Sequence, residues 1–162
     1  MNTTTLRLLV VLACSAPLAA CAARYAGVVS HVTDGDTVWV RPAHGGPPQH
    51  IRINGIDAPE ICQAFGTDSR DALTSLVLHK RVTVITHGAD DYRRTVAHLR
   101  VGKEDVGVWM VSHGYAWSYR FRRDPGPYAR QEAKARSAHV GLWGTGDAEI
   151  PRDFRVRHGS CH

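Results

Sequence analysis

The sequence predicts an α+β fold in which five β-strands are interspersed with helices. Five short segments are rich in β-branched residues or alternate between two faces, as strands do: 25–33, 37–41, 49–56, 81–87 and 95–101. Three further segments have apolar residues at helical spacing: 67–80, 105–113 and 128–139. A five-stranded Greek-key barrel, the OB-fold, is one compact arrangement of such strands, although periodicity alone does not select it.

Turn and capping signals separate these elements. The Asp-Gly-Asp sequence at 34–36 is a turn signal between the first two strands. In the third strand, isoleucines at 51 and 53 share one face. Thr67 is the expected N-cap of the first helix. The core is expected over 25–143, whereas 144–162 is polar and is expected to be an irregular tail.

The composition is that of one globular domain, and its basic charge favours an anionic partner. Of 162 residues, 43% are apolar and 22% are charged, which excludes a disordered chain. Twenty Lys and Arg against 15 Asp and Glu give a formal charge of +5. A basic balance favours nucleic acid or an anionic membrane surface as partner, but it is also common among small exported proteins.

The N-terminus, residues 1–21, is expected to be a signal peptide. Arg7 precedes a short apolar run at 8–13, as in a secretory signal, and a membrane-spanning helix would need about 20 apolar residues. The sequence Leu-Ala-Ala-Cys ending at Cys21 resembles the lipobox of bacterial lipoproteins, in which the cysteine is lipidated. The alternative is ordinary cleavage within 20–24.

Two cysteines remain after the signal peptide, Cys62 and Cys161. An exported chain reaches a compartment that permits disulfides, so we expect these two to be paired. The alternative is two unpaired buried thiols.

Acidic residues and arginines gather around two predicted turns: Asp34, Asp36, Asp57 and Glu60, with Arg52 between the turns in sequence and Arg94 further on. Calcium accepts flexible sets of carboxylate and carbonyl oxygens. Pro59 disfavours a helical conformation of Ala58, which would allow the Ala58 carbonyl to face the ion. Taken singly, an Asp-Gly-Asp sequence is most often just a turn, and a strand arginine is most often a solvated surface residue.

This combination is suited to phosphodiester hydrolysis. A cation polarises the phosphoryl oxygen and neutralises charge. Arginines offer paired donors to phosphate oxygens and stabilise the negative transition state. A carboxylate can accept a proton from the attacking water. The sequence therefore supplies every group that such a reaction needs.

The order and spacing of these residues resemble the staphylococcal nuclease family over residues 25–143. The motifs are DGDT at 34–37, IRINGIDAPE at 51–60 and YRRTVA at 92–97, followed by GYAW at 114–117, AR at 135–136 and GLW at 141–143. The resemblance implies the OB-fold barrel and calcium-dependent cleavage of DNA and RNA that leaves 3′-phosphates.

The resemblance also implies roles for single residues. Asp36 and Asp57 would bind Ca²⁺ through carboxylates and Ala58 through its carbonyl, while Asp34 would support these ligands without binding the ion. Glu60 would be the general base, a role that is debated within the family.

Arg52 and Arg94 would hold the scissile phosphate and its transition state. Tyr92 and Tyr119 lie near positions where the family uses tyrosines on the nucleotide.

Two departures from the family pattern affect the site. The family usually has glycine where this chain has Arg93, so a positive φ there would strain the turn. Because 95–97 (Thr-Val-Ala) directly follows Arg94, this arginine is the expected catalytic one. Arg120 and Arg122 stand where the founding member has aromatic residues, so stacking on the substrate is less strongly implied than catalysis.

Three functions fit these observations. The first is an active exported nuclease in the periplasm, on the outer membrane as a lipoprotein, or secreted. The second is a non-catalytic nucleic-acid-binding module of the same fold, and the third is a lipid-anchored structural protein with a basic face. The complete acidic and arginine set favours the nuclease. Its expected partners are DNA and RNA as substrate and a membrane only through the lipid anchor, and it is expected to be a monomer.

Overall fold

The computed structural model describes residues 23–144, 146, 148–159 and 161. The expected signal peptide, including Cys21, lies outside the described residues. None of the described helices is both long and apolar enough to cross a membrane.

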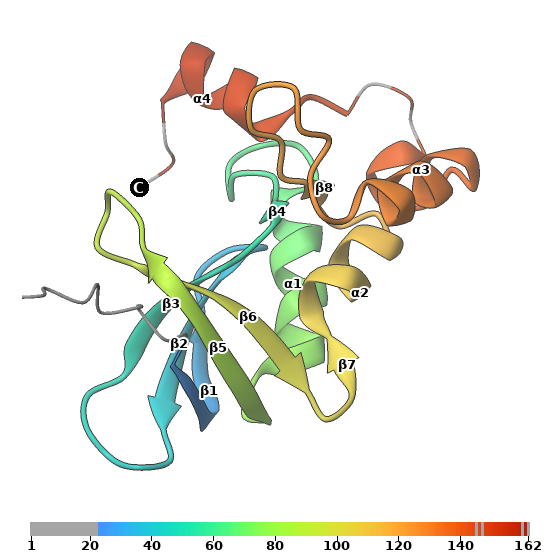
Figure 1. Ribbon diagram of the computed structural model, residues 1–162. Helices are drawn as coiled ribbons and strands as arrows, with labels where there is room; N and C mark the ends of the chain where they lie inside the picture. The colour runs from blue at the N-terminus through green and yellow to red at the C-terminus, as the bar shows by residue number, and fades with distance from the viewer. Residues whose placement is uncertain (1–22, 145, 147, 160, 162) are drawn as a thin grey trace, which may run out of the picture.

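Five strands form a closed barrel, which confirms the predicted α+β fold class (Figure 1). Neighbouring strands are antiparallel in the order β3-β2-β1-β5-β6, and a parallel pairing of β3 with β6 closes the sheet. β1 and β5 each contain a register shift, a bulge that bends a strand and so favours closure. The five strands are β1 (Arg24–Val32), β2 (Thr37–Pro42), β3 (Gln49–Ile53), β5 (Arg81–Ala89) and β6 (Thr95–Val101).

Two shorter pairings extend this framework. β7 (Glu104–Asp105) continues the sheet beyond β6, and β4 (Ile56–Asp57) pairs with β8 (Trp117–Ser118). The predicted third strand, 49–56, is thus two strands, because Gly55 turns the chain at a φ of +80°. This turn separates the Arg52 strand from the short strand that contains Asp57.

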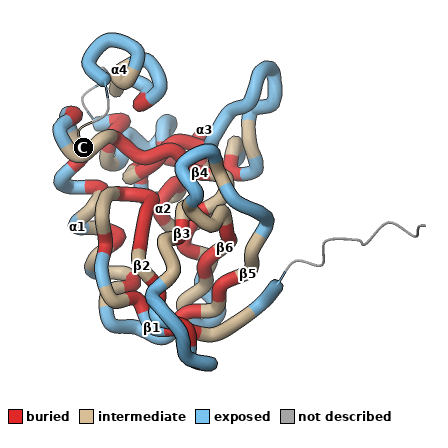
Figure 2. The backbone as a smooth tube through the Cα atoms, turned by 90° about the vertical axis from the view of Figure 1, so that its left-hand side faces the viewer, coloured by how far each residue is buried: buried red, intermediate tan, exposed pale blue. Residues whose placement is uncertain are grey.

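Alternate strand residues fill the barrel, and helices cover one end. Figure 2 shows the buried segments inside the fold and α4 at its exposed margin. The core comprises inward strand residues together with side chains of α1 and α2, including Val29, Val38, Ile51, Val84, Leu99, Leu73 and Met110. The helices are α1 (Gly66–Val77), α2 (Val106–Ser112), α3 (Ala129–Ser137) and α4 (Pro151–His158), with a single 3₁₀ turn η1 at Gly141–Trp143.

Two sequence-based expectations about the helices were wrong. Thr67 is not the N-cap of α1; Phe65 occupies that position in a left-handed conformation, with φ at +69°. The tail is not irregular throughout, since it contains α4 with Pro151 at its start. Proline suits the first turn of a helix, but α4 has only eight residues and only Pro151 of them is buried. Its apolar pattern was therefore too weak to reveal it.

Candidate active site

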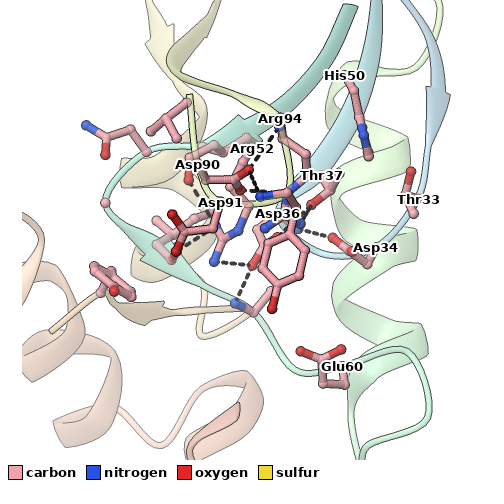
Figure 3. A pocket seen from close by; sticks show the side chains of 18 of the residues that line it. Thr33, Asp34, Asp36, Thr37, His50, Arg52, Glu60, Asp90, Asp91 and Arg94 are labelled. Atoms are coloured by element: carbon pink, nitrogen blue, oxygen red, sulfur yellow. Dashed lines mark hydrogen bonds and ion pairs between the residues drawn. The ribbon is translucent and has the colours of Figure 1, made fainter. Parts of the chain in front are cut away.

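One cleft of about 600 Å³ lies at the end of the barrel where several turns meet. Its walls come from the β1–β2 turn, the end of β3, the loop after β4, the β5–β6 hairpin, the residue after β8 and helix α4. Figure 3 shows the charged side chains of this cleft facing one another. Strands that are distant in sequence thus bring the predicted site residues together.

Asp36 links the two acidic turns. Its main-chain N–H donates to Asp34 Oδ1 at 3.0 Å, which holds the turn in shape. Its carboxylate accepts from the Ala58 N–H at 2.9 Å and from the Thr37 hydroxyl at 2.9 Å. A side chain at Gly35 would meet Ser69 Oγ at 2.0 Å, so only glycine allows this turn to pack on α1. The turn at Asp34–Asp36 is thus fixed both to Ala58 and to α1.

Arg52 lies between the two buried aspartates. Its Nη2 is 3.1 Å from Asp36 Oδ2 and 3.3 Å from Asp57 Oδ1. Its Nη1 donates to the main-chain oxygens of Ile53 and Ile56, at 3.1 and 2.8 Å. The guanidinium is therefore oriented at four points, and both carboxylates reach the same positive charge.

The acidic cluster is poorly solvated. Burial raises the pKa of the Asp34 carboxyl to about 7, and the Asp36 carboxylate adds to the shift. Burial also raises the pKa of Asp57, against the opposing effect of Arg52. Cations in the cleft therefore lower the free energy of its ionised carboxylates.

Arg94, rather than Arg93, lines the cleft. Its Nε donates to Asp90 Oδ2 at 2.7 Å, and its Nη1 lies 3.5 Å from Thr37 Oγ1. Although burial opposes the shift, hydrogen bonds from the Arg94 main chain and side chain lower the pKa of Asp90. Arg93 is exposed and has a φ of +61°, so it occupies the left-handed conformation that favours glycine.

The two predicted substrate tyrosines stand at the rim of the cleft. Tyr92 and Tyr119 both line it and are 81% and 45% exposed. The Arg94 guanidinium lies 5.3 Å from the centre of the Tyr92 ring. Arg120 turns toward α3, where its Nη2 is 2.6 Å from Glu132 Oε1. The Arg120 guanidinium therefore links the residues after β8 to α3.

Glu60 follows β4 on a tightly wound loop. Its N–H donates to Gln63 Oε1 at 3.1 Å, and its carbonyl accepts from the Gln63 N–H at 2.9 Å. A side chain at Gly66 would lie 1.9 Å from the Glu60 carbonyl oxygen. In Figure 3 Glu60 stands on this loop beside α1, apart from Arg52 and Arg94.

The C-terminal segment reaches the same loop. Cys62 and Cys161 form a disulfide with their Cα atoms 5.8 Å apart. Gln63 Nε2 donates to the Glu149 carbonyl at 2.6 Å. From α4, Arg155 Nη1 lies 2.7 Å from Glu60 Oε1 and 3.5 Å from Asp57 Oδ1.

Sequence reasoning missed Arg155 and Asp90. No sequence motif points to Asp90, although its position four residues before Arg94 suits an ion pair. Arg155 lies in a tail without a clear pattern, and the one available signal was indirect. A bond from Cys161 to Cys62, two residues after Glu60, places the preceding tail residues beside the site.

The donor set is compatible with a hard cation but is not a closed cage. Among the described residues, no three His, Cys, Asp or Glu side chains are placed to hold a metal ion. Asp36 and Asp57, both nearly buried, already share a single positive partner in Arg52. Main-chain and water oxygens, which calcium readily accepts, would have to complete the coordination.

Comparison with known proteins identifies the family. The family model described as "Staphylococcal nuclease homologue" matches residues 50–145, more than half of the chain. A Haemophilus influenzae protein named "Uncharacterized endonuclease" is 34% identical over 128 residues, which cover 78% of this chain and 71% of that protein. "Protein ParB" of Escherichia coli is 37% identical over 80% of this chain and 78% of its own.

A plant relative matches over a shorter region. The "Probable staphylococcal-like nuclease CAN4" of Oryza sativa is 36% identical over 65% of this chain, and the match spans only 21% of the rice protein. The family model's match over residues 50–145 includes the Asp57 turn, the Arg94 hairpin and helices α1 to α3. By its matching family model and its relatives, this chain belongs to the staphylococcal nuclease family.

Proposed function

We propose that this protein is a calcium-dependent nuclease that hydrolyses phosphodiester bonds of DNA and RNA. The observation that most supports this function is the convergence of Asp36, Arg52, Glu60 and Arg94 on one cleft, with the buried Asp57 paired to Arg52 just behind the cleft lining. Relatives that are named as endonucleases or nucleases support the same class of reaction.

Calcium is the cation that the donor set suits best. Asp36 and Asp57 would bind it through carboxylates and Ala58 through its carbonyl, with Asp34 holding the Asp36 turn. Magnesium is smaller and demands stricter octahedral geometry, whereas this open, mixed set of oxygens tolerates irregular coordination. When bound, the ion would supply Lewis-acid polarisation of the phosphoryl oxygen.

The remaining groups divide the reaction between them. Arg52 and Arg94 both line the cleft, and their guanidinium groups can donate to phosphate oxygens and stabilise charge in the transition state. Glu60 accepts a proton from the attacking water as general base. Tyr92 and Tyr119, at the rim, offer faces to the bases or sugars of either DNA or RNA.

Cleavage assays test this function directly. The mature protein should cut plasmid DNA and single-stranded RNA in calcium and stop when a calcium chelator is added. Undiminished cleavage in the chelator would overturn the metal assignment. Binding of DNA without cleavage, by folded protein in calcium, would instead indicate a non-catalytic module of the same fold.

Export and a lipid anchor at Cys21 are part of the proposal. The motivation is the apolar run followed by Leu-Ala-Ala-Cys, and the Cys62–Cys161 disulfide suits an oxidising compartment. Expressed with its own N-terminus in a bacterium, the protein should fractionate with membranes and begin at an acylated cysteine. Mass spectrometry that finds an unmodified start at Ala22, Ala23 or Arg24 would refute the anchor.

A further inference from the structure

The carboxylate of Glu60 depends on a different arginine from the other acids. Arg52 is the nearer ion-pair partner of Asp36 and Asp57, and Arg94 pairs with Asp90. Within the described part of the chain, the one side chain that forms an ion pair with the Glu60 carboxylate is Arg155 of α4, at 2.7 Å, and the same Nη1 lies 3.5 Å from Asp57 Oδ1. The orientation of Glu60 therefore depends on a helix outside the barrel.

The segment that contains Arg155 is fixed to the Glu60 loop at two further points. We call residues 149–159 the tail segment. At its start, the Glu149 carbonyl accepts from Gln63, whose own Oε1 accepts from the Glu60 N–H. Just beyond its end, Cys161 is bonded to Cys62. Both attachments lie within three residues of Glu60, so the tail segment and this loop form one unit.

From this arrangement we propose that Arg155 is a positioning residue, which holds the Glu60 carboxylate in the direction that the attacking water requires. The inference rests on the proposed nuclease function. A glutamate side chain has several rotatable bonds, and a short bond to a guanidinium selects one arrangement. Small misplacements of a reacting group lower rates steeply, so Arg155 acts on catalysis through Glu60.

The same geometry gives the disulfide a role in the site. Arg155 is 36% exposed and its helix has only one buried residue, so packing alone holds α4 weakly. The disulfide keeps the tail segment beside the loop and thereby keeps Arg155 within reach of Glu60. In the oxidised protein Arg155 thus stays against Glu60, whereas reduction of the disulfide frees α4 and Arg155 from the Glu60 loop.

A double-mutant cycle tests the positioning role. Arg155→Gln should lower kcat roughly 10- to 100-fold with little change in KM, and Arg155→Lys should recover part of that loss. In a Glu60→Gln background, Arg155→Gln should cost nothing further, because its effect passes through Glu60. Arg152→Gln is the matched control, since it removes an exposed arginine of the same helix and should leave the rate unchanged.

The outcomes separate this inference from the proposed function. A folded wild-type protein that does not cleave in calcium counts against the nuclease. An active wild type with a full rate in Arg155→Gln counts against the positioning role. So does a faster rate, which would make Arg155 an inhibitor, or an equal loss in the Glu60→Gln background, which would mean that Arg155 acts through Asp57 or on the substrate and not through Glu60.

Two measurements test whether the disulfide holds the tail segment beside the Glu60 loop. In metal-free protein, Cys161→Ser should speed amide hydrogen exchange over α4, a readout that needs no activity. Reduction of the disulfide should lower the wild-type rate toward that of Arg155→Gln and leave Arg155→Gln itself unaffected. Unchanged exchange, or a full rate in reduced wild type, would overturn the role of the disulfide.

Discussion

At the scale of single residues, the site depends on a few positions where only one side chain or backbone conformation fits. Gly35 lets the acidic turn pack against α1, and Asp36 joins that turn to Ala58. Arg93 fits its position less well, because a residue with a side chain there occupies a left-handed conformation at a φ of +61°. Such a conformation costs roughly 1–2 kcal/mol per residue.

Arg93→Gly is therefore expected to stabilise the protein by about 1 kcal/mol, which corresponds to a rise in Tm of about 2–4 °C. Arg93→Ala removes the same charge but retains the strained backbone, so it should give no such rise. Thermal unfolding of the three proteins without ligand measures the difference. Equal gains for Gly and Ala would mean that charge, not backbone strain, is responsible.

At the scale of elements, the loop between β4 and α1 places Glu60 by close contact with the start of the helix. Phe65 stands in a left-handed conformation and Gly66 packs directly on the Glu60 carbonyl. Sequence patterns did not reveal this contact, because an acceptable capping residue at Thr67 suggested a later helix start. The start of α1 is instead set by the close approach of the Glu60 loop, for which only glycine at position 66 leaves room.

Gly66→Ala should displace the Glu60 loop, because the added Cβ would lie 1.9 Å from a main-chain oxygen. We expect a loss of about 1–3 kcal/mol in the free energy of unfolding, the usual range for overpacking, and a lower cleavage rate. Thr67→Ala, the neighbouring exposed helix position, is the control and should change neither quantity. Urea unfolding and cleavage rates that match wild type in Gly66→Ala would contradict the importance of this contact.

At the scale of the whole molecule, the sequence allowed the barrel and much of the cleft to be predicted, but not the tail. The strand segments follow local periodicity, and the family motifs pointed to Asp36, Arg52 and Arg94, which the closed barrel brings together. By contrast, α4 is short and mostly exposed. Its position is set by the disulfide and Gln63, which are long-range contacts that local patterns do not encode.

The disulfide should stabilise the whole domain as well as the tail. It closes a loop of 99 residues in sequence, for which the chain-entropy model gives roughly 4–5 kcal/mol. Strain in the native state lowers the realised gain, so we expect Cys161→Ser to lower the free energy of unfolding by about 2 kcal/mol, the lower end of the usual range. Urea unfolding of the oxidised wild type, the reduced wild type and the variant measures this, and the last two should agree. Two alkylatable thiols in native oxidised protein would show that the bond does not form.

The rate constant for calcium-dependent cleavage of one defined DNA oligonucleotide, measured for wild type and matched variants, tests the proposed active site most directly. With the fold intact by circular dichroism, Glu60→Gln should be slower by on the order of 10²–10⁴, and Arg94→Lys by on the order of 10²–10³. Arg93→Lys, one residue away and outside the cleft, should cleave at the wild-type rate. Near-wild-type rates in Glu60→Gln and Arg94→Lys, or a loss confined to Arg93→Lys, would contradict the assignment of this cleft as the active site.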